Sequence, residues 1–167
     1  MDAIIETERL NLRQLCDDDW CLFHSLQSEP SVIELCFDKP SESEIKKNFE
    51  SRLPQWNIDS EHWLCLTIID QKSQIKVGVT GFRLSEGVAE VGYLLLPEFH
   101  GQGYATESLK AVLVGVITWA SFRVIKRWSL KGILHQSVSY RSVVLTCLKR
   151  LRTPMKSVGS CLMIMST

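Results

Sequence analysis

The stretch of sequence that decides the fold reads Pro97-Glu-Phe-His-Gly-Gln-Gly-Tyr-Ala-Thr-Glu-Ser-Leu109. An apolar run at 91–96 precedes it, and apolar residues recur after it at the spacing of a helix. A strand, a tight glycine turn and a helix therefore meet here. Because Gly101 and Gly103 have no Cβ, a ligand can lie close to the backbone at this turn.

Such a junction presents backbone N–H groups and the positive end of a helix dipole, which suits an anion and most naturally a phosphate. The same spacing is also typical of a plain strand-to-helix connection with two turn glycines, so the spacing alone leaves both interpretations open. A dinucleotide-binding fingerprint, Gly-x-Gly-x-x-Gly, does not fit, because Thr106 stands where the third glycine belongs.

Length and charge restrict the class of protein. A chain of 167 residues predicts a single domain over 1–167. Lys and Arg balance Asp and Glu at 19 each, which gives no general argument for nucleic acid or an acidic membrane as the partner. The longest apolar run, 111–120, is too short for a membrane span, and the charged first residues do not resemble a signal peptide. We therefore expect a cytoplasmic protein with no membrane or nucleic-acid partner.

The six cysteines form no Cys-x-x-Cys pair and no group with the four histidines that has the spacing of metal ligands. We interpret them as scattered reduced thiols and predict no metal site. They are Cys16, Cys21, Cys36, Cys65, Cys147 and Cys161.

The first half of the chain predicts one strand and two helices. Residues 8–15 alternate apolar and polar side chains, as in a half-buried strand. The acidic residues 17–19 can cap a helix that runs to about Ser28, with apolar residues at helical spacing. Ser41 followed by Glu44 matches a capping box, which predicts the start of a second helix.

Three strands are predicted next, over 63–69, 75–84 and 88–96, and polar turns join them. Short turns make this an antiparallel meander and not a series of βαβ units. A helix then follows the glycine turn, and 126–134 is a possible strand. The fold class predicted from this order is α+β, with a single layered domain.

Four segments resemble the GNAT acetyltransferases, specifically the branch that acetylates the N-termini of ribosomal proteins. They occur in family order and at family-like spacing: Thr7-Glu-Arg-Leu-Asn-Leu-Arg13, Val77-Gly-Val-Thr-Gly-Phe82, Ala89-Glu-Val-Gly-Tyr93 and Pro97 to Glu107. The resemblance covers about 4–124. It implies a mixed, mainly antiparallel sheet flanked by helices, with acetyl-CoA as co-substrate.

The resemblance also implies which residues bind the co-substrate. The family hallmark is Arg or Gln, two residues, Gly, one residue, then Gly or Ala, and His100 departs from it at the first position. Backbone N–H groups of the glycine turn would hold the pyrophosphate, and backbone groups at the end of the preceding strand would pair with the pantetheine arm. The residues so implicated are Leu94, Leu95, Leu96, His100, Gly101, Gln102, Gly103, Tyr104, Ala105 and Thr106.

Acetyl transfer to an amine needs a base for the amine and an acid for the leaving thiolate. Glu90, inside the third strand of the meander, is the candidate base; it can equally be a strand residue that faces solvent. Tyr93 is an odd number of residues away, so it should face the other side. His62 is a weaker candidate. In the family the acid comes from late in the chain, where Tyr140 is our choice among 139–142.

From about residue 137 the chain departs from the family pattern, which continues with Pro-x-Asn-x-x-Ser and then Val-Leu-Glu-Lys-Leu-Gly-Phe. Codons permitted for 143–156, read in a shifted frame, allow Val-Leu-Glu-Lys-Leu and then Tyr-Glu at the family spacing, although not the glycine. We therefore hypothesise a frame shift at about 136–142, or a degenerate tail.

Two functions follow from these observations. The first is transfer of an acetyl group from acetyl-CoA to a primary amine, either a protein N-terminus or a small amine, by direct attack in a ternary complex. The alternative is a catalytically impaired remnant, or a CoA-binding module, with a degenerate C-terminus. The sequence carries no motif that identifies the acceptor.

Overall fold

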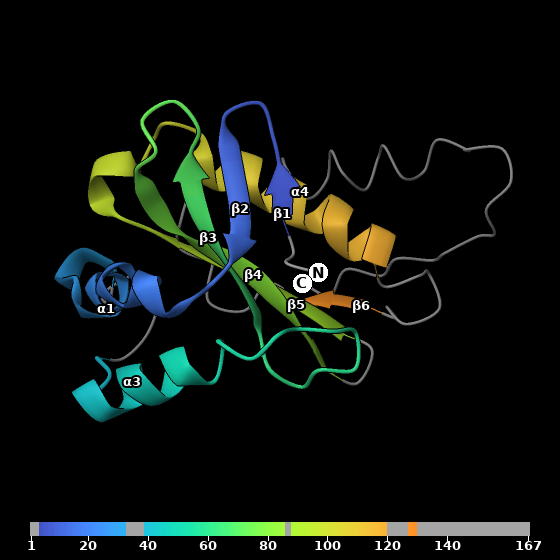
Figure 1. Cartoon of the computed structure of the whole chain (residues 1–167), viewed down its shortest axis with the longest axis horizontal. Coiled ribbons are helices and arrows are strands. Elements are labelled where there is room, and N and C mark those ends of the chain that lie inside the picture. The colour runs from blue at the N-terminus through green and yellow to red at the C-terminus, as the bar shows by residue number, and fades with distance from the viewer. Residues whose placement is uncertain (1–3, 33–38, 86–87, 120–126, 130–167) are drawn as a thin grey trace, which may run out of the picture.

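A six-stranded sheet forms the centre of the protein in the computed structural model, which describes residues 4–32, 39–85, 88–119 and 127–129 (Figure 1). The strands are β1 (Ile4–Glu6), β2 (Leu10–Gln14), β3 (Leu64–Asp70), β4 (Lys76–Ser85), β5 (Val88–Leu95) and β6 (Arg127–Ser129). Their order in the sheet is their order in the chain. All neighbours are antiparallel except β5 and β6, which pair in parallel. The predicted mixed, mainly antiparallel α+β fold is confirmed.

Helices cover both faces of this sheet (Figure 1). The long helix α4 (Tyr104–Trp119) packs on one face. The other face carries α1 (Trp20–Ser28) and α3 (Glu42–Glu50), with the short 3₁₀ turn η1 (Asp17–Asp19) leading into α1. Another 3₁₀ turn, η2 (Pro97–Phe99), lies between β5 and α4. Among the described residues, no helix combines the length and the apolar character needed to cross a membrane.

Alternation along the strands divides the core into two layers. In β3, Leu64 and Leu66 pack toward α4, whereas Cys65 packs toward α1 and α3. In β5, Val91 lies in the α4 layer, and Leu94 contacts the layer of α1 and α3. Every other side chain therefore enters the same layer, as the pleat requires. Both layers being buried explains why β3 is an almost continuous apolar run.

The predicted capping box at the start of α3 is confirmed. The Glu44 N–H donates to Ser41 Oγ at 3.4 Å, and the Ser41 N–H donates to Glu44 Oε2 at 2.7 Å. These two bonds satisfy donors that the first turn of a helix leaves unpaired. Ile45 and Phe49 then lie on the buried side of α3.

Two features of the sheet differ from the sequence prediction. Strand β1 was not predicted; it forms a hairpin with β2 and lies at the sheet edge. The pairing of β3 with β4 also contains a bulge, because Ile68 pairs with Gly78 while Ile69 pairs with Lys76. The extra residue, Val77, turns the following side chains of β4 to the opposite face.

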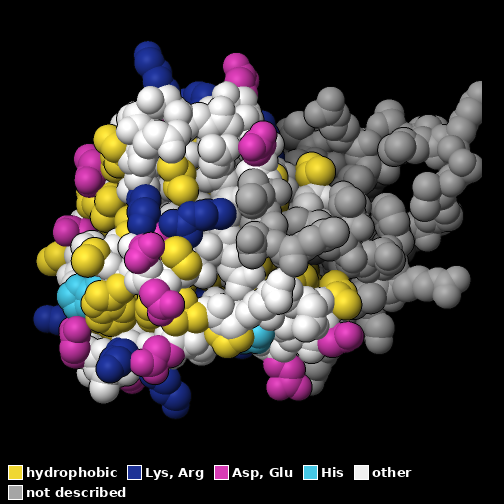
Figure 2. All heavy atoms as spheres, in the orientation of Figure 1, with side chains coloured by type: hydrophobic (Ala, Val, Ile, Leu, Met, Phe, Trp, Pro, Cys, Tyr) yellow, Lys and Arg dark blue, Asp and Glu magenta, His cyan; other side chains and the backbone are white. Residues whose placement is uncertain are grey.

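Figure 2 shows Lys and Arg side chains interspersed with Asp and Glu over the described part of the face in view. This mixing agrees with the formal net charge of zero.

Candidate active site

The glycine turn between η2 and α4 has the backbone geometry that only glycine adopts easily. Gly101 has φ of 74° and Gly103 has φ of 82°. A Cβ on either residue would be strained by this left-handed conformation. A Cβ at Gly101 would meet nothing within 4 Å, so the space above it is open. The turn therefore exposes bare backbone, and we call residues 101–106 the cradle.

Helix α4 adds N–H donors to the cradle. Its first intrahelical bond runs from the Glu107 N–H to Gly103 O at 3.0 Å. The amide groups of Gly103, Tyr104 and Ala105 therefore precede the hydrogen-bond ladder of the helix. Donors at this end point outward and carry the positive end of the helix dipole. The predicted meeting of a strand, a glycine turn and a helix start is thus present.

Contacts from both sides hold the cradle in place. Gln102 Nε2 donates to Glu98 O at 2.8 Å, and the rings of Phe99 and Tyr104 meet edge to face at 6.0 Å between centroids. The Tyr104 hydroxyl donates to Asp70 Oδ2 at 2.9 Å, across from the end of β3. This bond to Asp70 raises the pKa of Tyr104. The turn is therefore a braced element of the fold.

His100, at the first position of the family hallmark, bonds back to the strand that precedes it. Its Nε2 lies 3.0 Å from Leu95 O. A carbonyl oxygen only accepts, so Nε2 carries the proton in this bond. The imidazole thus connects the cradle to the last residue of β5.

The end of β5 offers backbone groups on one side only. The Leu96 N–H donates to Val77 O at 3.0 Å and is used by the pairing with β4. Peptide groups alternate in direction along a strand, so those of Leu95 point away from β4. On that side, described pairing with β6 is confined to Val88–Glu90. Of the three leucines at 94–96, Leu95 therefore has the backbone geometry that suits the predicted pantetheine contact, through its N–H, because its carbonyl accepts from His100 Nε2.

Glu90 lies on β5 in the face of the sheet that carries α1 and α3. Its carboxylate accepts from Arg83 Nη2 at 2.5 Å, and Glu90 is only 9% exposed. The Arg83 guanidinium in turn lies over the Trp63 ring, 5.8 Å from its centroid. Tyr93 packs against the α4 layer instead, as the odd spacing predicted. The carboxylate is thus buried and fixed by an ion pair.

The predicted site residues form two groups along β5. The cradle and Leu95 lie together at the end of the strand, whereas Glu90 is five residues earlier, about 17 Å along a strand. A ligand that contacts both must be elongated. His62 bonds Pro54 O at 3.3 Å in the loop before β3. Tyr140, with its neighbours at 139 and 142, lies outside the described residues.

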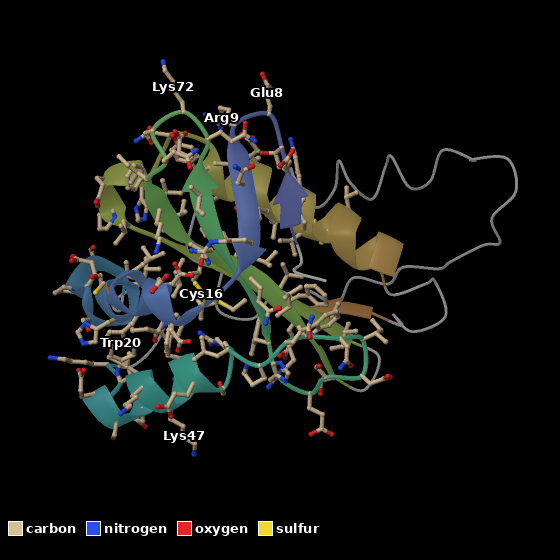
Figure 3. The ribbon with its side chains drawn as sticks, in the orientation of Figure 1. Glu8, Arg9, Cys16, Trp20, Lys47 and Lys72 are labelled. Carbon is tan, nitrogen blue, oxygen red and sulfur yellow. The ribbon has the colours of Figure 1, made fainter. Side chains whose placement is uncertain are left out.

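Two residues at the cradle were not assigned any role from the sequence. Arg9, in the turn between β1 and β2, donates from Nε to Glu107 Oε2 at 2.7 Å. Glu107 lies in the first turn of α4. Figure 3 shows Arg9 beside Glu8 at this end of the sheet, on the same side as Lys72 in the turn before β4. The two residues are 98 positions apart, so no local pattern could reveal their contact.

The fold and the cradle together define a protein suited to an anionic, phosphate-bearing ligand, and comparison with known families identifies the family. Residues 9–129 match the profile described as the Acetyltransferase (GNAT) domain. This chain therefore belongs to the GNAT acetyltransferase family, whose members use acetyl-CoA. A search of curated protein sequences gives no match.

Solved structures show the same fold at low sequence identity. One is the acetyltransferase from Salmonella typhimurium that modifies the N-terminal serine of ribosomal protein L7/L12, with 23% identity, TM-score 0.62, and coverage of 86% of this chain and 83% of that chain. The RimL L7/L12 α-N-acetyltransferase in complex with CoA has 22% identity, TM-score 0.57, and coverage of 75% and 72%. A GNAT acetyltransferase from Bacillus anthracis has 23% identity, TM-score 0.56, and coverage of 70% and 67%.

Proposed function

We propose that this chain transfers the acetyl group of acetyl-CoA to a primary amine, by direct attack of the amine in a ternary complex. The observation that carries the proposal is the cradle: two glycines with left-handed φ, followed by helix-start amides, at the end of a strand whose pairing with β6, among the described residues, is confined to Val88–Glu90. Family membership gives the co-substrate, and this geometry fits it.

The cradle suits a diphosphate because both of its contributions act on negative charge. Backbone N–H groups from 101–106 would donate to the phosphate oxygens, and the dipole of α4 would stabilise the charge. From there the pantetheine arm would follow β5 past the Leu95 backbone. The thioester would then come near Glu90, because CoA is elongated enough to contact both groups.

Glu90 is the proposed base. An amine attacks only in its neutral form, and a carboxylate held nearby can take the ammonium proton directly or through a water molecule. Arg83 orients that carboxylate through their ion pair. The neutral nitrogen forms a bond to the thioester carbon while the carbon–sulfur bond breaks, and the leaving thiolate takes a proton. We propose Tyr140 as the donor of this proton.

A protein N-terminus is the acceptor to test before a small amine. Two of the similar structures are described as enzymes that act on ribosomal protein L7/L12. Their identity to this chain is below 25%, so they support a protein N-terminus as one acceptor to test first. A peptide with the N-terminus of such a protein is the appropriate first substrate.

Two measurements test the proposal. CoA should raise the melting temperature of the protein, because a ligand that binds only the native state stabilises it. Acetyl-CoA with a panel of peptides and small amines should then release free thiol at a rate that depends on the amine. If CoA does not raise the melting temperature, the assignment of the cradle as a CoA site is wrong.

Stabilisation without thiol release would favour the second candidate, an impaired remnant or CoA-binding module. The observation in its favour is the sequence beyond about residue 137, which lacks the family pattern. That segment lies outside the described residues, so turnover is what separates the two functions.

A further inference from the structure

The Thr7-Glu8-Arg9 motif has no part in the chemistry proposed above, yet its side chains reach the cradle. The Thr7 hydroxyl donates to Glu107 Oε1 at 2.6 Å, and the Arg9 backbone N–H donates to the same oxygen at 2.9 Å. Arg9 Nε donates to Glu107 Oε2 at 2.7 Å. Burial raises the pKa of Glu107, but the bonds from Thr7 and Arg9 outweigh it and the net pKa is lowered. An ionised Glu107 thus holds Arg9 in a defined position.

The guanidinium held in this way also contacts the cradle itself. Arg9 Nη1 donates to Gln102 O at 3.2 Å, and the guanidinium carbon lies 5.0 Å from the centroid of the Tyr104 ring. A Cβ built at Gly103 would come within 3.3 Å of Arg9 Nη2. Arg9 therefore forms one wall of the cradle.

The bond to Gln102 O determines where the next amide points. In a planar trans peptide the C=O and N–H point in opposite directions. Because the Gln102 carbonyl is bonded toward Arg9, the Gly103 N–H is turned away from Arg9. Gly103 has no side chain that could restrict this peptide by other means.

We propose that Arg9 is a positioning residue of the CoA site, which fixes the Gln102–Gly103 peptide so that the Gly103 N–H faces the diphosphate. This inference rests on the proposed function, because it assigns the diphosphate to the cradle. It gives the motif at 7–9 a role in ligand binding beyond joining the hairpin of β1 and β2 to α4. As a surface ion pair alone, Arg9 and Glu107 would contribute little to the stability of the fold.

Isothermal titration of the full chain with CoA and with dephospho-CoA tests this role in wild type, Arg9→Gln and Arg9→Lys. Arg9→Gln should weaken both ligands about tenfold, the effect of one charge-assisted hydrogen bond. Arg9→Lys should weaken them similarly, because an ammonium cannot reproduce the fork that bonds Glu107 and Gln102 O together. The matched control is Arg52→Gln. Arg52 also lies over an aromatic ring, that of Phe23 at 5.0 Å, but on the other side of the sheet.

Kinetics separates positioning from a structural role. In Arg9→Gln the KM for acetyl-CoA should rise about tenfold, while kcat and the KM for the amine stay at wild-type values. Titrations are done well below the melting temperature of each ligand-free variant, measured by circular dichroism. If Arg9→Gln does not fold, Arg9→Lys carries the test, because it keeps a cation beside Glu107.

Three results would overturn the inference: CoA binding by Arg9→Gln within twofold of wild type, full rescue by Arg9→Lys, or a loss seen with CoA but not with dephospho-CoA. The last would assign Arg9 to the 3′-phosphate. Failure of the wild type to bind CoA would instead overturn the proposed function, so the two failures are distinguishable.

Discussion

The Asp19 carboxylate accepts hydrogen bonds from both terminal nitrogens of Arg13, at 2.7 and 2.9 Å, although Asp19 is fully buried at the start of α1. Lys76 Nζ lies 2.7 Å from Asp19 Oδ1, and the Thr67 hydroxyl donates to Asp19 Oδ2 at 2.8 Å. Three strands and a helix start are therefore connected through one carboxylate. The sequence predicted an acidic helix start here. Asp19 accepts from the Cys16 N–H at 3.1 Å in the capping box of η1, makes no side-chain cap bond to α1, and also attaches this turn to the sheet.

Removal of this charge should destabilise the fold. Asp19→Asn leaves Arg13 and Lys76 without their common partner, and breaking such a buried ion pair costs about 3 kcal/mol. Urea unfolding at pH 7 measures the change in the free energy of unfolding. Asp17→Asn is the matched control, because Asp17 is exposed in the same turn and should leave the stability unchanged. Equal stability of the two variants would contradict the assignment.

The ion pairs of Asp19 with Arg13 and Lys76 also predict that the protein loses stability in acid. Burial raises the pKa of Asp19, but the hydrogen bonds from Arg13 and Lys76 outweigh it and the net pKa lies far below the usual range. A lowered folded-state pKa stabilises the protein above the unfolded pKa of about 3.9, and this stability is lost as the pH falls toward the folded pKa. The difference between wild type and Asp19→Asn should therefore be full at pH 6 and shrink below about pH 4.

Gly101→Asn should separate binding from folding. Asn tolerates left-handed φ better than other residues with a side chain, and a Cβ here meets nothing within 4 Å. The melting temperature without ligand should therefore stay near that of wild type. The new side chain stands over the cradle, so the stabilisation by CoA should be largely lost. A stabilisation by CoA equal to that of wild type would show that the ligand does not approach Gly101.

Glu90→Gln should lower kcat by about a hundredfold to ten-thousandfold, the range for loss of a general base. The KM for acetyl-CoA should change little, since the cradle is at the other end of β5. Both constants are measured from thiol release over a range of pH. In Glu90→Gln the rate should increase more steeply with rising pH than in wild type, because the reaction then depends on amine that is already unprotonated. Glu61→Gln, at an exposed position before β3, is the control. An unchanged kcat would leave Glu90 as a structural partner of Arg83.

Cysteine labelling checks the core beneath α1 and α3. Burial raises the pKa of the Cys65 thiol to about 11, so little thiolate is present at pH 8. Iodoacetamide should modify Cys21, which is exposed, and leave Cys65 unmodified until urea unfolds the protein. Peptide mass spectrometry measures each site. Rapid labelling of Cys65 in the native protein would contradict the packing of this layer.

The nucleotide sequence across 134–167 tests the frame-shift hypothesis. If a shift occurred at about 136–142, the third base of each codon for 146–150 should combine with the first two bases of the following codon to spell Val-Leu-Glu-Lys-Leu. Third bases that do not spell Leu-Glu-Lys would end the hypothesis. The degenerate-tail alternative would then remain.

Features encoded by neighbouring residues could be predicted from the sequence. The capping box at Ser41, the antiparallel meander and the strand–turn–helix junction at the cradle each depend on patterns within one segment or between consecutive segments of the chain. The bulge at Val77 could not be predicted, because apolar residues on both sides of β4 do not show which face each one takes.

Contacts between distant segments were also beyond the sequence. Arg9 and Glu107 each fit a plausible solvent-exposed role when their local sequences are considered alone. The same is true of Glu90 and Arg83, whose pairing follows only from the register of β4 against β5. Burial and pairing are decided by tertiary packing, which a single sequence does not display.

The order of the strands has a consequence for how the chain reaches its native state. Strands β3, β4 and β5 pair across short turns, which brings little entropy cost of loop closure. Pairing of β2 with β3 must first enclose both helices of one face, and the Arg9–Glu107 contact closes a loop of 98 positions. Nucleation should therefore occur in β3–β5, and the wall that Arg9 builds beside the cradle should be among the last contacts to form.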